Sequence, residues 1–106
     1  MNKSKLNNGI SLLDDELEVQ KITVYPNPFI DHISLDLNNI GTGNKNLRLQ
    51  LTDITGKVLK VKDFVLDGSV DNLMLSLQDI NLQPGVYLLR TTGDKIKTET
   101  FKIIKR

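Results

Sequence analysis

The side chains with the clearest potential for chemistry are one histidine and one run of acids. His32 is the only histidine, it follows Asp31, and the chain contains no cysteine. Zinc sites need several converging nitrogen or sulfur ligands, so we interpret this pair as solvated side chains at the start of a strand. The acidic run DDELE at residues 14–18 lacks the alternating ligand spacing and the turning glycine of a calcium loop. The sequence therefore predicts no metal site and no cofactor.

Patterns for nucleophilic catalysis and for phosphate binding are also missing. No serine lies in the glycine elbow that exposes a hydrolase nucleophile, and nothing supports a Ser-His-Asp arrangement through His32. The segment GTGNKN at residues 41–46 matches neither a P-loop nor a dinucleotide fingerprint, because strand-like patterns flank it on both sides. We therefore predict that this protein is not an enzyme.

Composition indicates one small globular domain with no broad charged surface. The chain has 106 residues, 39% of them hydrophobic and 25% charged, and a net charge of +1. That balance argues against nucleic-acid binding. No apolar run approaches the roughly 18 residues of a membrane-spanning helix, and the first residues lack the apolar core of a secretory signal peptide. We expect a chain without a transmembrane segment or a signal peptide of its own.

Hydrophobic periodicity predicts an all-β domain preceded by a flexible lead-in. Apolar and polar residues alternate, as in half-buried strands, and turn signals separate the runs. This pattern predicts a seven-stranded antiparallel β-sandwich over residues 21–106, with residues 1–20 as a linker. The seven expected strands are residues 21–25, 32–37, 47–51, 57–66, 73–77, 85–91 and 97–104.

Two of these strands carry more specific expectations. In residues 57–66 we expect Leu59 and Val61 to face inward and the alternation to slip near Asp63 and Phe64, as a bulge would cause. Residues 85–91 are apolar on both faces, which predicts a central strand covered on both sides. The lysines of the last strand predict that it lies at a sheet edge, where charge discourages unwanted strand addition.

Turn chemistry is clearest in three places. Asp53 and Gly56 predict a tight turn, with the carboxylate accepting backbone N–H groups and the glycine taking a positive φ. Residues 39–44 predict a wider hairpin loop, and residues 84–85, Pro-Gly, predict a turn before the central strand. These turns divide the chain at the spacing of a sandwich.

The segment YPNPF, residues 25–29, interrupts the first strand with two prolines. Because Tyr25 and Asn27 each precede a proline, both are biased to extended conformations. We expect a stiff corner that Asn27 ties by side-chain-to-backbone hydrogen bonds and that Phe29 pins to the core.

Four stretches occur in an order and spacing that resemble a known family. They are VYPNPFIDHISLDL, LRLQLTDITGKVL, LQDINLQPGVYLLRT and KTETFKIIKR. Together they resemble the C-terminal sorting domain of cargo proteins of the type IX, or Por, secretion system in Bacteroidetes. The resemblance covers Lys21 to Arg106.

The resemblance implies an immunoglobulin-like sandwich with structural and recognition residues in place of catalytic ones. The common small residue after the second proline is Phe29 here, and the paired cysteines and core tryptophan of antibody domains are absent. The matching positions are Tyr25, Pro26, Asn27, Pro28, Asp53, Gly56, Lys57, Gly85, Tyr87, Phe101, Lys102, Ile103, Ile104 and Lys105.

The implied role is that of an address on a larger cargo protein. The cargo would cross the inner membrane by its own signal peptide and fold in the periplasm. The outer-membrane translocon would then recognise this domain, and a surface sortase would cut upstream of it, leaving the cargo at the outer membrane surface or outside the cell. An exposed edge strand also predicts a weak homodimer.

Two other hypotheses stay open at this point. A generic immunoglobulin-like adhesion or carbohydrate-binding module has the same strand count, and Tyr25 would be its exposed aromatic residue; affinity on a glycan array would favour it. An enzyme comes third, and hydrolase activity lost in His32→Ala would support it.

Overall fold

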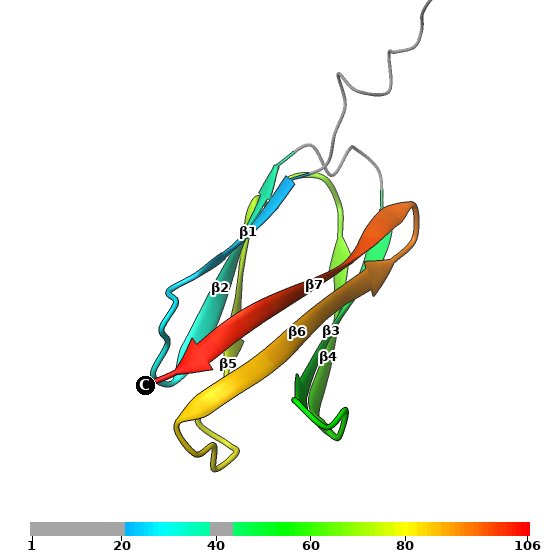
Figure 1. Cartoon of the computed structure of the whole chain (residues 1–106). Coiled ribbons are helices and arrows are strands. Elements are labelled where there is room, and N and C mark those ends of the chain that lie inside the picture. The colour runs from blue at the N-terminus through cyan, green and yellow to red at the C-terminus, as the bar shows by residue number, and fades with distance from the viewer. Residues whose placement is uncertain (1–20, 39–43) are drawn as a thin grey trace, which may run out of the picture.

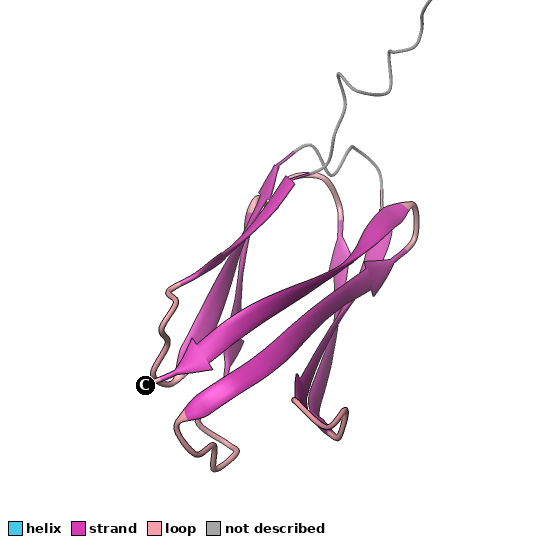
Figure 2. Cartoon of the chain, viewed as in Figure 1, coloured by secondary structure: helices cyan, strands magenta, loops and turns pink. Residues whose placement is uncertain are grey.

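All regular structure in the described part of the chain is β-strand. The computed structural model describes residues 21–38 and 44–106, and Figure 2 shows strands joined by loops throughout these ranges. The expectations for residues 1–20 and for most of the loop at 39–44 lie outside the described residues. The strands are β1 (Lys21–Tyr25), β2 (His32–Asn38), β3 (Lys45–Asp53), β4 (Val58–Leu66), β5 (Asn72–Ser76), β6 (Gly85–Gly93) and β7 (Ile96–Lys105).

The strands form two antiparallel sheets packed face to face. One sheet has the order β1-β2-β5 and the other the order β4-β3-β6-β7, with β7 at an edge as predicted (Figure 1). Every strand pair within the sheets is antiparallel. The predicted seven-stranded sandwich is therefore confirmed.

The core lies between the sheets and is built by the alternation seen in the sequence. The inward side chains of β2 and β3 are almost wholly buried, and those of β5, β6 and β7 complete the layer. Burying one Leu or Ile side chain contributes about 1.5–3 kcal/mol, so this layer is the main source of stability. The fully buried strand residues include Ile33, Leu35, Leu47, Leu49, Leu51, Leu75, Leu89 and Ile103.

The face assignment of β4 was partly wrong. Val61 is 45% exposed and lies opposite Gln50, so it points outward. The register shift lies between Leu51 and Thr52, opposite Leu59, and not near Asp63. Because β4 is an edge strand, it accommodates the extra residue there, and Lys60 and Val61 take the faces opposite to those predicted.

The shifted register turns a lysine of β4 toward the other sheet. Lys60 lies opposite the buried Leu51, and its Nζ donates hydrogen bonds to the Ser76 carbonyl at 2.8 Å and to Asp79 Oδ1 at 2.7 Å. The ion pair with Lys60 lowers the pKa of the Asp79 carboxyl. An inward lysine of this kind protects the edge of a sheet against strand addition.

The central position of β6 was predicted correctly, but the prediction that both of its faces are covered was wrong. The strand is central, between β3 and β7. Its outer face is uncovered: Val86 is 38% exposed and Leu88 is half-buried. A two-layer sandwich buries one face of each sheet, which leaves the second apolar face of β6 in contact with solvent.

Candidate functional site

The YPNPF segment at residues 25–29, which we call the opening motif, lies beside the end of β7, the closing strand, although the two are far apart in the sequence. Asn27 Nδ2 donates to the Lys102 carbonyl at 3.2 Å, and Asn27 Oδ1 accepts from the Ile104 N–H at 2.9 Å. These partners are separated by 75 and 77 residues. Figure 1 shows the segment after β1 running beside the end of β7, next to the C-terminus. The expected side-chain-to-backbone bonds of Asn27 are present, and they tie two ends of the domain together.

Phe29 continues this contact with its backbone. Its N–H donates to the Ile104 carbonyl at 2.8 Å, and its carbonyl accepts from the Arg106 N–H at 2.8 Å. The result is a short parallel bridge between Phe29 and Lys105 on the outer edge of β7. Residues 27–29, which we call the strap, therefore occupy the edge of β7 at its last residues.

The side chain of Phe29 anchors the strap in the core. It is completely buried, and its ring meets Tyr87 edge to face, with centroids 6.5 Å apart and planes at 66°. Aromatic pairs prefer this geometry because the positive ring edge faces the negative ring face. The prediction that Phe29 pins the corner to the core is confirmed.

Tyr87, near the start of β6, forms a corner that was not predicted from the sequence. Its hydroxyl donates to the carbonyl of Gln83, four residues upstream, at 2.6 Å. A tyrosine near the start of the sixth strand that bonds back to the upstream backbone is a feature of immunoglobulin sandwiches. The signal was present as a tyrosine shortly after the Pro-Gly turn. Gly85 begins the strand at φ +150°, a backbone conformation that favours glycine.

The other residues of the opening motif have separate roles. The peptide bonds preceding Pro26 and Pro28 are both cis. Tyr25 is 42% exposed, and its hydroxyl accepts a hydrogen bond from the side-chain amide of Asn72. It is the one exposed aromatic side chain in the described residues, so these residues present no cluster of aromatic rings of the kind that sugar-binding platforms use.

The turn from Asp53 to Lys57 is fixed by one carboxylate. Asp53 Oδ1 accepts from the Thr55 N–H at 2.8 Å, the Thr55 hydroxyl at 2.6 Å and the Lys57 N–H at 3.0 Å. Gly56 has φ +95°, as the turn prediction requires. The hydrogen bond from the Thr55 hydroxyl, followed by those from the backbone, holds the pKa of the Asp53 carboxyl below its usual value.

The motif residues gather at one end of the sandwich. The register of the four-stranded sheet aligns Asp53 with Tyr87 and Tyr87 with Ile103 in one row. Gly85 lies opposite Lys105, two pairs further toward the same end of the sheet. Along β7, Phe101 and Ile103 face the core, whereas Lys102 and Ile104 face outward. Three motifs distant in sequence therefore meet at one end of the four-stranded sheet, beside the strap.

Asp31 and His32 contact each other at the start of β2. His32 is the first residue of β2, and its Nδ1 lies 3.0 Å from Asp31 Oδ1. Gln78 Nε2 donates to the other oxygen of Asp31 at 3.1 Å, and these hydrogen bonds lower the pKa of that carboxyl, the one with His32 most. Within the described ranges, no three His, Cys, Asp or Glu residues are placed to hold a metal ion.

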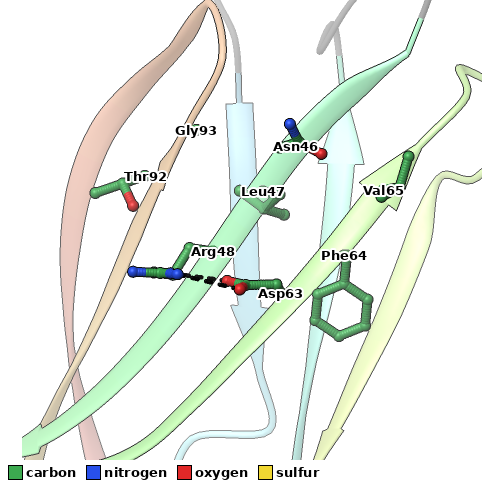
Figure 3. A pocket seen from close by; sticks show the side chains of 8 residues that line it. All are labelled: Asn46, Leu47, Arg48, Asp63, Phe64, Val65, Thr92 and Gly93. Carbon is green, nitrogen blue, oxygen red and sulfur yellow. Dashed lines mark hydrogen bonds and ion pairs between the residues drawn. The ribbon is translucent and has the colours of Figure 1, made fainter.

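A pocket of about 400 Å³ lies at the opposite end of the four-stranded sheet (Figure 3). Its charged groups satisfy each other: Arg48 Nε and Nη2 donate to the two carboxylate oxygens of Asp63 at 2.8 and 3.1 Å. This pairing lowers the pKa of Asp63. The lining residues include no nucleophile paired with a base; they are Asn46, Leu47, Arg48, Asp63, Phe64, Val65, Thr92 and Gly93.

Comparison with known proteins identifies the family. The model of the secretion system C-terminal sorting domain matches residues 23–106, which include the strap, the turn at Asp53 and the closing strand. A comparison with curated proteins gave no match. None of the described residues belongs to a helix that could span a membrane. Domains of this family act as sorting signals and are generally not catalysts. The chain belongs to the family of secretion system C-terminal sorting domains.

Proposed function

We propose that this domain is the address by which a larger cargo protein is directed through the type IX outer-membrane translocon. The cargo folds in the periplasm, and the translocon reads the folded domain. A surface sortase then cuts within or near residues 1–20, and the cargo is attached to the outer membrane surface or released. The domain itself contributes recognition and not catalysis.

The observation that carries this proposal is the junction between the strap and β7. Four hydrogen bonds from Asn27 and Phe29 hold the last residues of the domain. The end of β7 is therefore held on both edges, by β6 on one side and by the strap on the other. A signal of this kind reports that the whole domain is folded, which suits recognition of cargo after folding in the periplasm.

Removal of the last five residues tests the proposal. The full chain is fused to the C-terminus of a fluorescent reporter that carries an inner-membrane export signal, in a bacterium with a type IX system. We expect the fusion to reach the surface or the medium, and we expect deletion of residues 102–106 to leave it in the periplasm. The deletion removes the carbonyl and N–H groups that the strap binds.

The control is the full-length fusion with Asn81→Ala, a substitution at an exposed loop residue of the same domain. Immunoblots of the periplasmic fraction establish that each fusion accumulates intact. Surface delivery of the truncated fusion at the level of the control would contradict the proposal.

A further inference from the structure

The outer face of the four-stranded sheet carries an apolar patch at the end where β7 terminates. The register places Val86 opposite Ile104 and Leu88 opposite Lys102. Residues directly opposite in antiparallel strands point to the same face. Val86 and Ile104 are 38% and 40% exposed, and Val58 on β4 is 49% exposed. We define the outer-face patch as Val58, Thr52, Val86, Leu88, Lys102 and Ile104.

The charge at this end of the face has one sign. Lys102 lies within the outer-face patch, and Arg90 is exposed on the same face one pleat further along β6. Among the outward residues paired in the described sheet, the one carboxylate is Asp63, near the other end, and Arg48 binds both of its oxygens. The apolar side chains are therefore flanked by cations with no carboxylate among them.

The edge of β7 is closed at the same place. At this end of β7, the strap binds the four backbone groups that point away from β6. They are the carbonyls of Lys102 and Ile104 and the N–H groups of Ile104 and Arg106. A partner strand that added to this edge would first have to displace Asn27 and Phe29, and the Phe29 ring is completely buried. Strand addition at the terminal residues is therefore disfavoured, whereas the sheet face beside them is accessible.

We propose that the outer-face patch is the surface on which a protein of the secretion machinery docks, and that this partner presents apolar side chains flanked by carboxylates. This inference rests on the proposed function and names the surface that is read. Apolar contact supplies affinity at such an interface, and the complementary charges supply orientation and association rate. The partner approaches the face of the sheet and leaves the strap in place.

Charge also decides between this partner and a second copy of the chain. A symmetric pairing of two outer-face patches would bring Lys102 and Arg90 of each copy toward the same cations of the other. Like charges placed together across an interface cost several kcal/mol. An acidic partner avoids this repulsion.

Outward substitutions in the full-chain reporter fusion test the inference. The test variants are Lys102→Glu, Arg90→Glu and Ile104→Ser. Lys21→Glu is the matched control on the other sheet, and Val65→Ser is the matched control at the far end of the same face. We expect each test variant to lower surface delivery by at least about fivefold, as for central residues of an interface, and each control to match the wild type. Thermal melts of the isolated variants establish folding.

Each outcome supports or contradicts the inference. Delivery lost in the folded test variants and retained in the controls supports it. If Ile104→Ser melts early, the two charge reversals decide, because both side chains are exposed. Normal delivery of both reversals overturns the inference and leaves the proposed function intact, whereas failure of the wild-type fusion to be delivered overturns the proposed function. A wild-type dimer in sedimentation that Ile104→Ser abolishes would assign the patch to a second copy and also overturn the inference.

Discussion

Replacing Asn27 with alanine should loosen the closing strand without changing the core. The substitution removes the hydrogen bonds to the Lys102 carbonyl and the Ile104 N–H. A hydrogen bond of this kind contributes about 0.5–1.5 kcal/mol net, so the two together predict a loss of about 1–3 kcal/mol in the free energy of unfolding. For a domain near this size, each kcal/mol corresponds to a fall of about 4–8 °C in Tm.

Urea unfolding measures the loss, and amide hydrogen exchange locates it. The Ile104 amide should exchange faster in Asn27→Ala, whereas the amides of central β3 should change only as much as global stability does. Asn27→Asp keeps an acceptor for the Ile104 N–H and loses the donor to Lys102, so we expect an intermediate effect. Asn81→Ala, in an exposed loop, is the matched control.

An Asn27→Ala protein whose unfolding free energy lies within about 0.5 kcal/mol of the wild type, the range of neutral surface substitutions, would contradict the predicted role of Asn27. Unchanged exchange at Ile104 would refute it independently. Either result would mean that the strap does not hold the end of β7.

Three further predictions concern stability. Phe29→Ala removes a completely buried ring and should cost about 3–5 kcal/mol in urea unfolding; a cost below 1 kcal/mol would contradict its role as the anchor of the strap. Thr91 is completely buried, and its hydroxyl has no hydrogen-bond partner among the described residues, so Thr91→Val should raise the unfolding free energy by about 1 kcal/mol, and a destabilised variant would show that the hydroxyl is paired. The Asp53 carboxyl has a pKa below 3.8 in the folded state, so its contribution to stability is present above pH 4 and is lost as the pH falls through the folded pKa. Asp53→Asn should therefore be less stable at pH 7 and lose less stability between about pH 5 and pH 3 than the wild type, and identical pH profiles would contradict this account.

The two-layer sandwich and most of its core could be predicted from alternation alone. Leu35 and Leu49 lie on strands where each apolar residue is followed by a polar one, so the buried face is unambiguous. The turn at Asp53 was equally predictable, because its geometry depends on residues within four positions of each other.

The faces of β4 could not be predicted because this edge strand carries apolar residues on both sides. Val61 and Val65 point outward, whereas Lys60 points inward and places its ammonium group at the end of the neighbouring sheet. A lysine can do this because its aliphatic stem packs against apolar surface while its charge finds polar partners. Local hydrophobicity therefore predicts the wrong core-facing residues in this part of β4.

The residues of the candidate site were named from the sequence, but their arrangement in space was not predicted. That Asn27 makes side-chain-to-backbone bonds follows from its residue type between two prolines. That those bonds join it to Ile104 depends on how the segment after β1 crosses to the other sheet, and no local signal encodes a contact across 77 residues. The outer-face patch was not predicted because both apolar faces of β6 were expected to be covered.

The most direct test of the sorting role is transfer of export to an unrelated protein. The 106-residue chain is fused to a reporter that carries an inner-membrane export signal, and surface reporter is measured in a type IX-secreting bacterium and in the same strain without its outer-membrane translocon. We expect surface or extracellular reporter in the first strain and periplasmic reporter in the second. Equal delivery in the two strains, or periplasmic retention in both, would contradict the sorting role.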